Sequence, residues 1–197
     1  MKLALLRHAP TTWNEEGRLQ GLSDIHLSRA GRAAARGWRL PDRLYGWRRI
    51  SSPLLRALET AALTGLQDPE IDPRLREMDW GNWEGQTLDS LRHADPTAMA
   101  TNEAAGLDFR PPDGESPREV RSRLLDLVRD LGADGRDTVA VTHRGVMRAA
   151  LSAATGWDFT GAPPVRMPRY GLLMLTMDDN AALFPDDPPV IATGGGR

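Results

Sequence analysis

Apolar and polar positions follow two different periods along this chain. Short apolar runs at 3–6 and 139–141 are typical of buried strands. Elsewhere apolar residues recur every three or four positions, as at Leu124, Val128 and Leu131, which is the spacing of an amphipathic helix. Strands that alternate with helices predict an α/β fold, a three-layer α/β/α sandwich with a mostly parallel central sheet.

The boundary residues place the elements more closely. Strands are expected at about 2–7 and 49–52, in the run that ends at His143, and at 171–175. Ser28 is the expected N-cap of a helix to about 38, Pro53 the first residue of a helix to about 66, and Ser116 the start of a capping box. Further helices are expected at about 87–93 and 145–154. The stretch 95–113 has no clear period and predicts a loop or a small helical cap.

Length and composition favour one domain over residues 1–184. The segment 185–197 is rich in proline and glycine, has little to bury, and is expected to be a disordered tail. The short apolar stretch at the N-terminus reads as a first strand and not as a signal peptide. Because no apolar run reaches the ~20 residues of a membrane helix, a cytoplasmic location is the default expectation.

Charge and residue usage exclude several classes of chemistry. The formal net charge is −2, so no basic excess favours nucleic acid or a membrane surface as a partner. The chain has no cysteine, which excludes disulfides, thiolate nucleophiles and cysteine-ligated metals. Lys2 is the single lysine and lies at the terminus, which excludes a P-loop lysine or a Schiff-base lysine in the core.

Polar side chains stand where the predicted strands end. Arg7 and His8 follow the first strand, and His143 follows a later one. The carboxyl ends of parallel strands meet at one edge, so the two histidines are expected in one site. Arg56 lies near the start of the helix at Pro53, where its guanidinium and free backbone N–H groups are expected to face the same anion. Two arginines offer planar forks that match phosphate oxygens.

This arrangement predicts phosphoryl transfer. Arginines disfavour a protonated His8, which leaves a lone pair for in-line attack on phosphorus. His143 is expected to donate a hydrogen bond to the transferring oxygens. An acid must protonate the leaving oxygen, and Glu77 is the candidate, with Asp79 and Glu84 as nearby carboxylates that could replace it.

These residues resemble the histidine phosphatases, the phosphoglycerate mutase-like superfamily, over roughly residues 1–178. The resemblance is carried by Arg7-His8 and by positions between Thr11 and Leu27, among them Asn14 and Gln20-Gly21. It continues in segments 52–61, 75–85, 114–116 and 141–143.

The resemblance implies that His8 is the phosphorylated nucleophile and Glu77 the proton donor. It further implies that the phosphoryl group is bound by Arg7, Arg56 and His143, assisted by Asn14, and that neither a metal ion nor an organic cofactor is needed. Gln20 and Gly21 are predicted substrate-binding positions on the same basis.

Two positions depart from the family pattern. Ala9 stands where the signature has glycine, and its added methyl group is expected to be tolerated. Arg144 stands where glycine usually follows the second histidine. Arg144 is predicted to bind substrate, with solvent or a surface ion pair as the open alternative.

The other candidate residues lack a motif that would indicate a catalytic or metal-binding role. His26 and His93 have no motif around them and are expected to be exposed or structural. No histidine–carboxylate spacing predicts a metal site. Trp80 and Trp83 are expected to pack their loop against the domain, with Trp80 as a candidate wall of the substrate entrance.

Together these observations predict a metal-independent phosphomonoesterase that acts on a small phosphorylated metabolite through a phosphohistidine and releases inorganic phosphate. One alternative is mutase-type transfer of the phosphoryl group to another hydroxyl. Another is a catalytically silent module that only binds phosphorylated ligands. Neither the physiological substrate nor the oligomeric state follows from the sequence.

Overall fold

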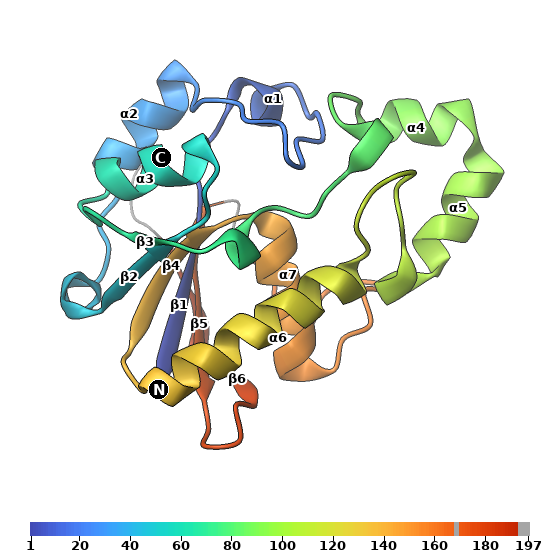
Figure 1. The fold of residues 1–197 in the computed structure, drawn as a ribbon. Helices are drawn as coiled ribbons and strands as arrows, with labels where there is room; N and C mark the ends of the chain where they lie inside the picture. The colour runs from blue at the N-terminus through green and yellow to red at the C-terminus, as the bar shows by residue number, and fades with distance from the viewer. Residues whose placement is uncertain (168–169, 193–197) are drawn as a thin grey trace.

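The computed structural model describes residues 1–167 and 170–192, and Figure 1 shows its ribbon. Within these residues six strands form one sheet in the order β3-β2-β4-β1-β5-β6. They are β1 (Lys2–Arg7), β2 (Arg48–Ser51), β3 (Glu70–Ile71), β4 (Thr138–Thr142), β5 (Gly171–Met177) and β6 (Leu183–Ala192). The first four are parallel to one another, whereas β5 is antiparallel to both of its neighbours. The mostly parallel sheet is confirmed.

Helices cover both faces of this sheet and extend beyond it. The α-helices are α1 (Thr12–Glu15), α2 (Arg29–Gly37), α3 (Leu55–Leu63), α4 (Leu88–Ala94), α5 (Pro96–Ala104), α6 (Pro117–Asp134) and α7 (Arg144–Thr155). Short 3-10 turns are η1 (Asp42–Gly46), η2 (Pro73–Leu75), η3 (Gly81–Trp83) and η4 (Gly106–Asp108). Among the described residues, no helix combines the length and apolar character that crossing a bilayer requires.

Alternating side chains of the strands build the core on two sides. In β1, Leu3 and Leu5 pack with α6 and α7, whereas Ala4 and Leu6 pack with α2 and α3. Figure 1 shows these helix pairs on opposite sides of the sheet, and the predicted three-layer α/β/α sandwich is confirmed. Helices α4 and α5 stand away from the sheet, so the stretch 95–113 is a small helical cap.

The helix expected from Pro53 begins later, at Leu55. Leu54 keeps an extended backbone and donates its N–H to Ser52 Oγ (3.3 Å). Asp24 caps the helix by accepting the N–H of Leu55 (2.8 Å). The cap comes from a distant part of the chain, which local sequence reasoning does not see.

The expected disordered tail is wrong for residues 185–192, which belong to β6, where Pro185 and residues 190–192 pair with β5. The expected boundary at 184 therefore falls inside this strand, and residues 193–197 lie outside the described part. Prolines in this segment argued against a strand. Because β6 is an edge strand, however, it needs ladder hydrogen bonds on one side only, and proline is tolerated there.

One close contact in the fold leads to a stability prediction. A Cβ on Gly31 in α2 would collide with the carbonyl oxygen of Pro10, which already accepts the N–H of Ser28 (2.9 Å). We expect Gly31→Ala to lower the free energy of unfolding by about 1–3 kcal/mol, since backbone must move. Gly37→Ala in the same helix is the control, because its methyl group meets no atom within 4 Å. Urea denaturation measures both, and equal stabilities would contradict the close contact.

Candidate active site

His8 directly follows β1 and is buried at the carboxyl edge of the sheet. Its Nδ1 lies 2.7 Å from the carbonyl oxygen of Ala9. A carbonyl only accepts, so Nδ1 carries the proton and Nε2 keeps its lone pair. Burial, then the charges of Arg56 and Arg7, hold the pKa of His8 well below its usual range. His8 is therefore a neutral imidazole with Nε2 ready to act as a nucleophile.

His143 is the N-cap of α7 and faces His8, with the two ring centroids 5.1 Å apart. Its Nε2 lies 2.7 Å from Ser52 Oγ, at the end of β2. Its Nδ1 is buried and has no hydrogen-bond partner among the described residues. Burial, and then the charge of Arg56, hold the pKa of His143 well below its usual range. The carboxyl ends of β1, β2 and β4 thus bring the two predicted histidines together.

Arg56 is fully buried in the first turn of α3. Its two terminal nitrogens donate to the carbonyls of Ser23 (2.8 Å) and Gly21 (2.7 Å), and its buried Nε has no partner among the described residues. Burial lowers its pKa, but a guanidinium stays charged at any physiological pH. Arg7 is half-buried at the end of β1 and its charge acts on both histidines.

The expectation of free backbone N–H groups beside Arg56 is wrong for Leu54, the N-cap of α3, and for Leu55, its first residue. Ser52 Oγ accepts the N–H of Leu54, and Asp24 accepts that of Leu55. The anion-binding character of this edge therefore comes from guanidinium groups and not from these backbone donors.

Glu77 lies where α7 begins. Its Oε1 accepts the N–H groups of Met78 (2.9 Å) and Gly145 (3.0 Å). A Cβ on Gly145 would collide with this same Oε1, so glycine is what lets the carboxylate approach. Of the carboxylates whose charge acts on Arg56, Glu77 acts most strongly. The structure thus brings the predicted acid to the histidine edge.

The two competing carboxylates are engaged in loop structure. Glu84 accepts the backbone N–H groups of Leu22 (2.6 Å) and Ser23 (2.8 Å) and so fixes the loop that contacts Arg56. Asp79 accepts the N–H of Gly81 (2.8 Å). Glu77 also accepts backbone N–H groups, so its position sets it apart: it contacts the first turn of α7, two residues after His143.

The other predicted binding residues shape the loop over the site. Gln20 accepts from Asn14 Nδ2 (3.4 Å) and donates to Thr11 Oγ1, while Gly21 offers its carbonyl to Arg56. Arg144 is exposed in the first turn of α7, and the described side chains give it no ion pair. Solvent and a substrate anion therefore remain as its two alternatives.

The remaining residues singled out in the sequence have structural contacts. Ala9 is buried in the apolar cluster below α2 and α3, as its expected tolerance requires. His26 is exposed and pairs with Glu59 (2.6 Å), and exposed His93 lies 2.6 Å from the carbonyl of Asp89. The described residues hold no group of three or more metal-ligating side chains placed around a common point.

Sequence reasoning missed an ion pair that holds the Glu77 segment. Arg123 of α6 binds both carboxylate oxygens of Glu115 at 2.7 and 2.9 Å. The same guanidinium donates to the carbonyls of Arg74 and Glu77, the latter at 3.2 Å. The sequence did hold a signal for this ion pair, because Arg123 lies next to Leu124 on the apolar stripe of the helix. A long charged side chain on a buried stripe needs a partner.

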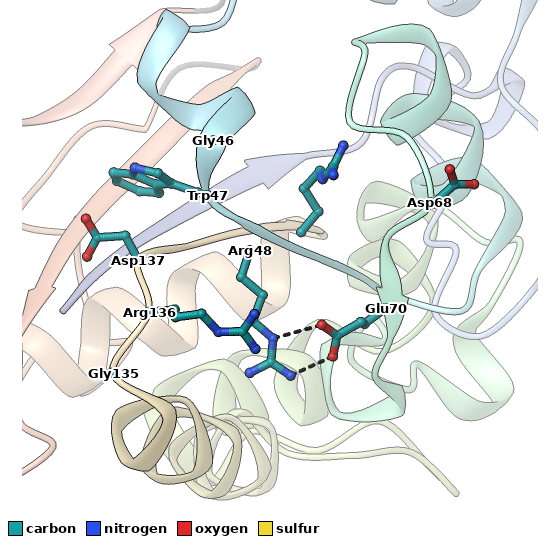
Figure 2. A pocket seen from close by; sticks show the side chains of 9 residues that line it. Gly46, Trp47, Arg48, Asp68, Glu70, Gly135, Arg136 and Asp137 are labelled. Carbon is teal, nitrogen blue, oxygen red and sulfur yellow. Dashed lines mark hydrogen bonds and ion pairs between the residues drawn. The ribbon is translucent and has the colours of Figure 1, made fainter.

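Two hollows among the described residues bear on the question of a ligand site. One, of about 440 Å³, is lined by Gly145 of α7 and by residues of α4 and α5. The other, of about 690 Å³, lies at the amino ends of β2, β3 and β4. Figure 2 shows this second hollow, with Arg48 bound to Glu70. Its three arginines are balanced by three carboxylates, namely Arg48, Arg49 and Arg136 against Asp68, Glu70 and Asp137. It lies at the opposite ends of the strands from the histidines and has no net charge to attract a phosphate.

The chain matches a known protein family and is similar in sequence to several known proteins. The family model of the histidine phosphatase superfamily (branch 1) matches residues 3–184. The chain is 38% identical over 174 residues to the glucosyl-3-phosphoglycerate phosphatase of Mycolicibacterium vanbaalenii, covering 79% of this chain and 74% of that protein. It is 36% identical over 162 residues to the probable phosphoglycerate mutase GpmB of an Enterobacter species, covering 79% of this chain and 75% of that protein.

Solved structures of related proteins also superpose on this fold. YhfR of Bacillus stearothermophilus superposes with a TM-score of 0.75 at 34% identity, over 90% of this chain and 91% of its own. A mycobacterial glucosyl-3-phosphoglycerate phosphatase superposes with a TM-score of 0.72 at 29% identity, over 88% of this chain and 89% of its own.

The buried neutral histidines predict a specific pH dependence. In the unfolded chain a histidine titrates near pH 6.5, whereas His8 and His143 resist protonation in the fold. Below about pH 6.5 the unfolded state binds more protons, so we expect the free energy of unfolding to fall as the pH falls. Urea denaturation from pH 7 to pH 5 should show a weaker decline in the double variant His8→Gln/His143→Gln. An unchanged decline would contradict the neutral assignment.

Proposed function

The chain belongs to the histidine phosphatase superfamily (branch 1), and from this premise we propose that it is a phosphomonoesterase that acts through a phosphohistidine on His8 without a metal ion. The observation that carries the proposal is the buried, neutral His8, whose Nδ1 proton is held by the carbonyl of Ala9. This hydrogen bond directs the Nε2 lone pair to phosphorus, between the charges of Arg7 and Arg56.

In the first step His8 Nε2 attacks phosphorus and forms a P–N bond, while the bond from phosphorus to the ester oxygen breaks. Glu77, in its protonated form, gives its proton to that leaving oxygen. Arg7 and Arg56 balance the charge on the non-bridging oxygens. The buried Nε of Arg56 and Nδ1 of His143 would gain acceptors from the phosphoryl group.

In the second step water attacks phosphorus, and the Glu77 carboxylate accepts a proton from it. The P–N bond breaks, His8 returns to its neutral state, and inorganic phosphate is released. The proton that Glu77 gives to the leaving oxygen in the first step is replaced by the one it takes from water in the second, so the cycle closes with no added reactant other than water.

We propose a small phosphorylated metabolite as the substrate, and Asn14, Gln20, Gly21 and Arg144 as further substrate-binding residues. The phosphatase named among the relatives supports hydrolysis. The probable phosphoglycerate mutase among them supports the alternative, transfer of the phosphoryl group to a second hydroxyl. A cytoplasmic location remains a prediction from the sequence.

The proposal predicts hydrolysis of p-nitrophenyl phosphate in the presence of EDTA. His8→Ala should lower kcat by at least about 10³-fold, because it removes the nucleophile. His26→Ala, at an exposed histidine, is the matched control. Rapid quenching should trap an acid-labile phosphoprotein in the wild type and in His26→Ala but not in His8→Ala. Full activity in His8→Ala contradicts the proposal, phosphate binding without turnover indicates a silent module, and faster transfer to glycerate hydroxyls than to water indicates a mutase.

The ion pair between Arg123 and Glu115 predicts a dependence on the leaving group. If Arg123 positions Glu77, Arg123→Met should reduce kcat/KM far more for glycerol 3-phosphate than for p-nitrophenyl phosphate. Nitrophenolate leaves without a proton, whereas an alkoxide needs one, which is worth roughly 10²- to 10⁴-fold. Arg129→Met, on the exposed side of the same helix, is the control. An equal reduction for both substrates would indicate a purely structural role for Arg123.

A further inference from the structure

The hollow of about 440 Å³ beside Gly145 has apolar walls and charged ends. Aromatic rings of Trp80, Phe109 and Phe159 line it, and the first two meet edge to face at 5.7 Å. Met78 and Leu88 add apolar surface. The volume is typical of a site for a small organic molecule, and such walls suit an apolar or ring-shaped body.

This hollow adjoins the residue assigned as the proton donor. Gly145 lines it, and the N–H of Gly145 is bound by Glu77 Oε1 at 3.0 Å. Met78, the next residue after Glu77, lines it too. The group that Glu77 protonates is the leaving oxygen of the ester, so the part of the substrate behind that oxygen lies on this side of the site.

Arg148 brings an uncompensated charge to the hollow. Its guanidinium carbon lies 5.0 Å from the ring centroid of Trp157 and 4.8 Å from that of Phe159. Among the described side chains no carboxylate forms an ion pair with it. The other cation of the lining, Arg92, is bound by Glu103 at 2.6 Å. The lining therefore carries one net positive charge.

The surroundings of Arg148 favour an incoming anion. Burial and then the charge of Arg144 lower the pKa of Arg148, whereas the charge of Glu77 raises it. A partly buried guanidinium without a counter-ion is costly, and a ligand that supplies one is stabilised in return. The aromatic contacts hold the planar group in place, so less side-chain entropy is lost when it binds.

We propose that this hollow receives the leaving group of the substrate and that Arg148 binds a carboxylate on it. Preferred substrates would be phosphate monoesters whose alcohol or phenol part has an apolar body and ends in a carboxylate. The inference rests on the proposed function. One net positive charge matches a carboxylate better than a second phosphate, and the planar guanidinium matches its two oxygens.

Gly145 and Arg148 lie three positions apart in α7, a rise of about 4.5 Å, and both line the hollow. A leaving group with a single aromatic ring is therefore a suitable first probe, with its ester oxygen near Gly145 and its carboxylate near Arg148.

Binding of two non-hydrolysable phosphonates tests the inference. The ligands are 4-carboxybenzylphosphonate and 4-carbamoylbenzylphosphonate, which share their shape and differ by one charge. Calorimetry should give a Kd at least about tenfold lower for the carboxylate in the wild type. The two affinities should become similar in Arg148→Gln, whereas Arg148→Lys, which keeps the charge, should retain a preference. Arg129→Gln, a charge removal on the exposed side of α6, is the matched control.

Equal affinities in the wild type, an unchanged preference in Arg148→Gln, or no binding of either ligand would overturn the inference. Because binding needs no turnover, the two proposals fail separately. Phosphatase activity without a carboxylate preference overturns only the role of Arg148. A carboxylate preference in a protein that cannot turn over p-nitrophenyl phosphate overturns only the proposed function.

Discussion

The burial of the Arg56 guanidinium is the constraint on which the rest of this structure depends. A charge with no access to water is costly unless its donors find acceptors, and here the carbonyls of Gly21 and Ser23 accept from the two terminal nitrogens. The loop that carries these carbonyls must in turn be held, and Glu84 holds it through two backbone N–H groups. The same buried charge helps to keep both histidines neutral. One cation thus links the loop geometry to the chemistry.

An ion pair performs the equivalent task for Glu77, the proposed acid. Arg123 and Glu115 are both almost buried, and the guanidinium contacts the main chain of the segment that carries Glu77. The two histidines and Glu77 are therefore held in place by different parts of the fold. His8 and His143 stand on strand ends within a rigid sheet, whereas Glu77 stands on an irregular segment fixed by an arginine from a neighbouring helix.

In the proposed function, the edge of the sheet and the surface beyond it serve different parts of a substrate. The histidines and Arg56 are buried where three parallel strands end, which suits a compact group such as phosphate. The hollow beside α7 is walled by the cap formed by α4, α5 and η4, and its lining mixes rings with two arginines. Under this proposal, one phosphoryl-binding geometry would accept different leaving groups when the cap changes.

The sequence by itself determined the alternation of strands and helices over much of the chain, the strand-end positions of His8 and His143, and the capping box at Ser116. These depend on local periods, on short-range hydrogen bonds and on the rule that parallel strands end at one edge. Only the tertiary structure decided that Asp24 caps α3, that β6 continues to Ala192, that Ser52 contacts His143 and that Arg123 holds the Glu77 segment. Each of these is a contact between residues far apart in the chain, and no local pattern encodes which distant group will satisfy a buried donor or an unpaired edge.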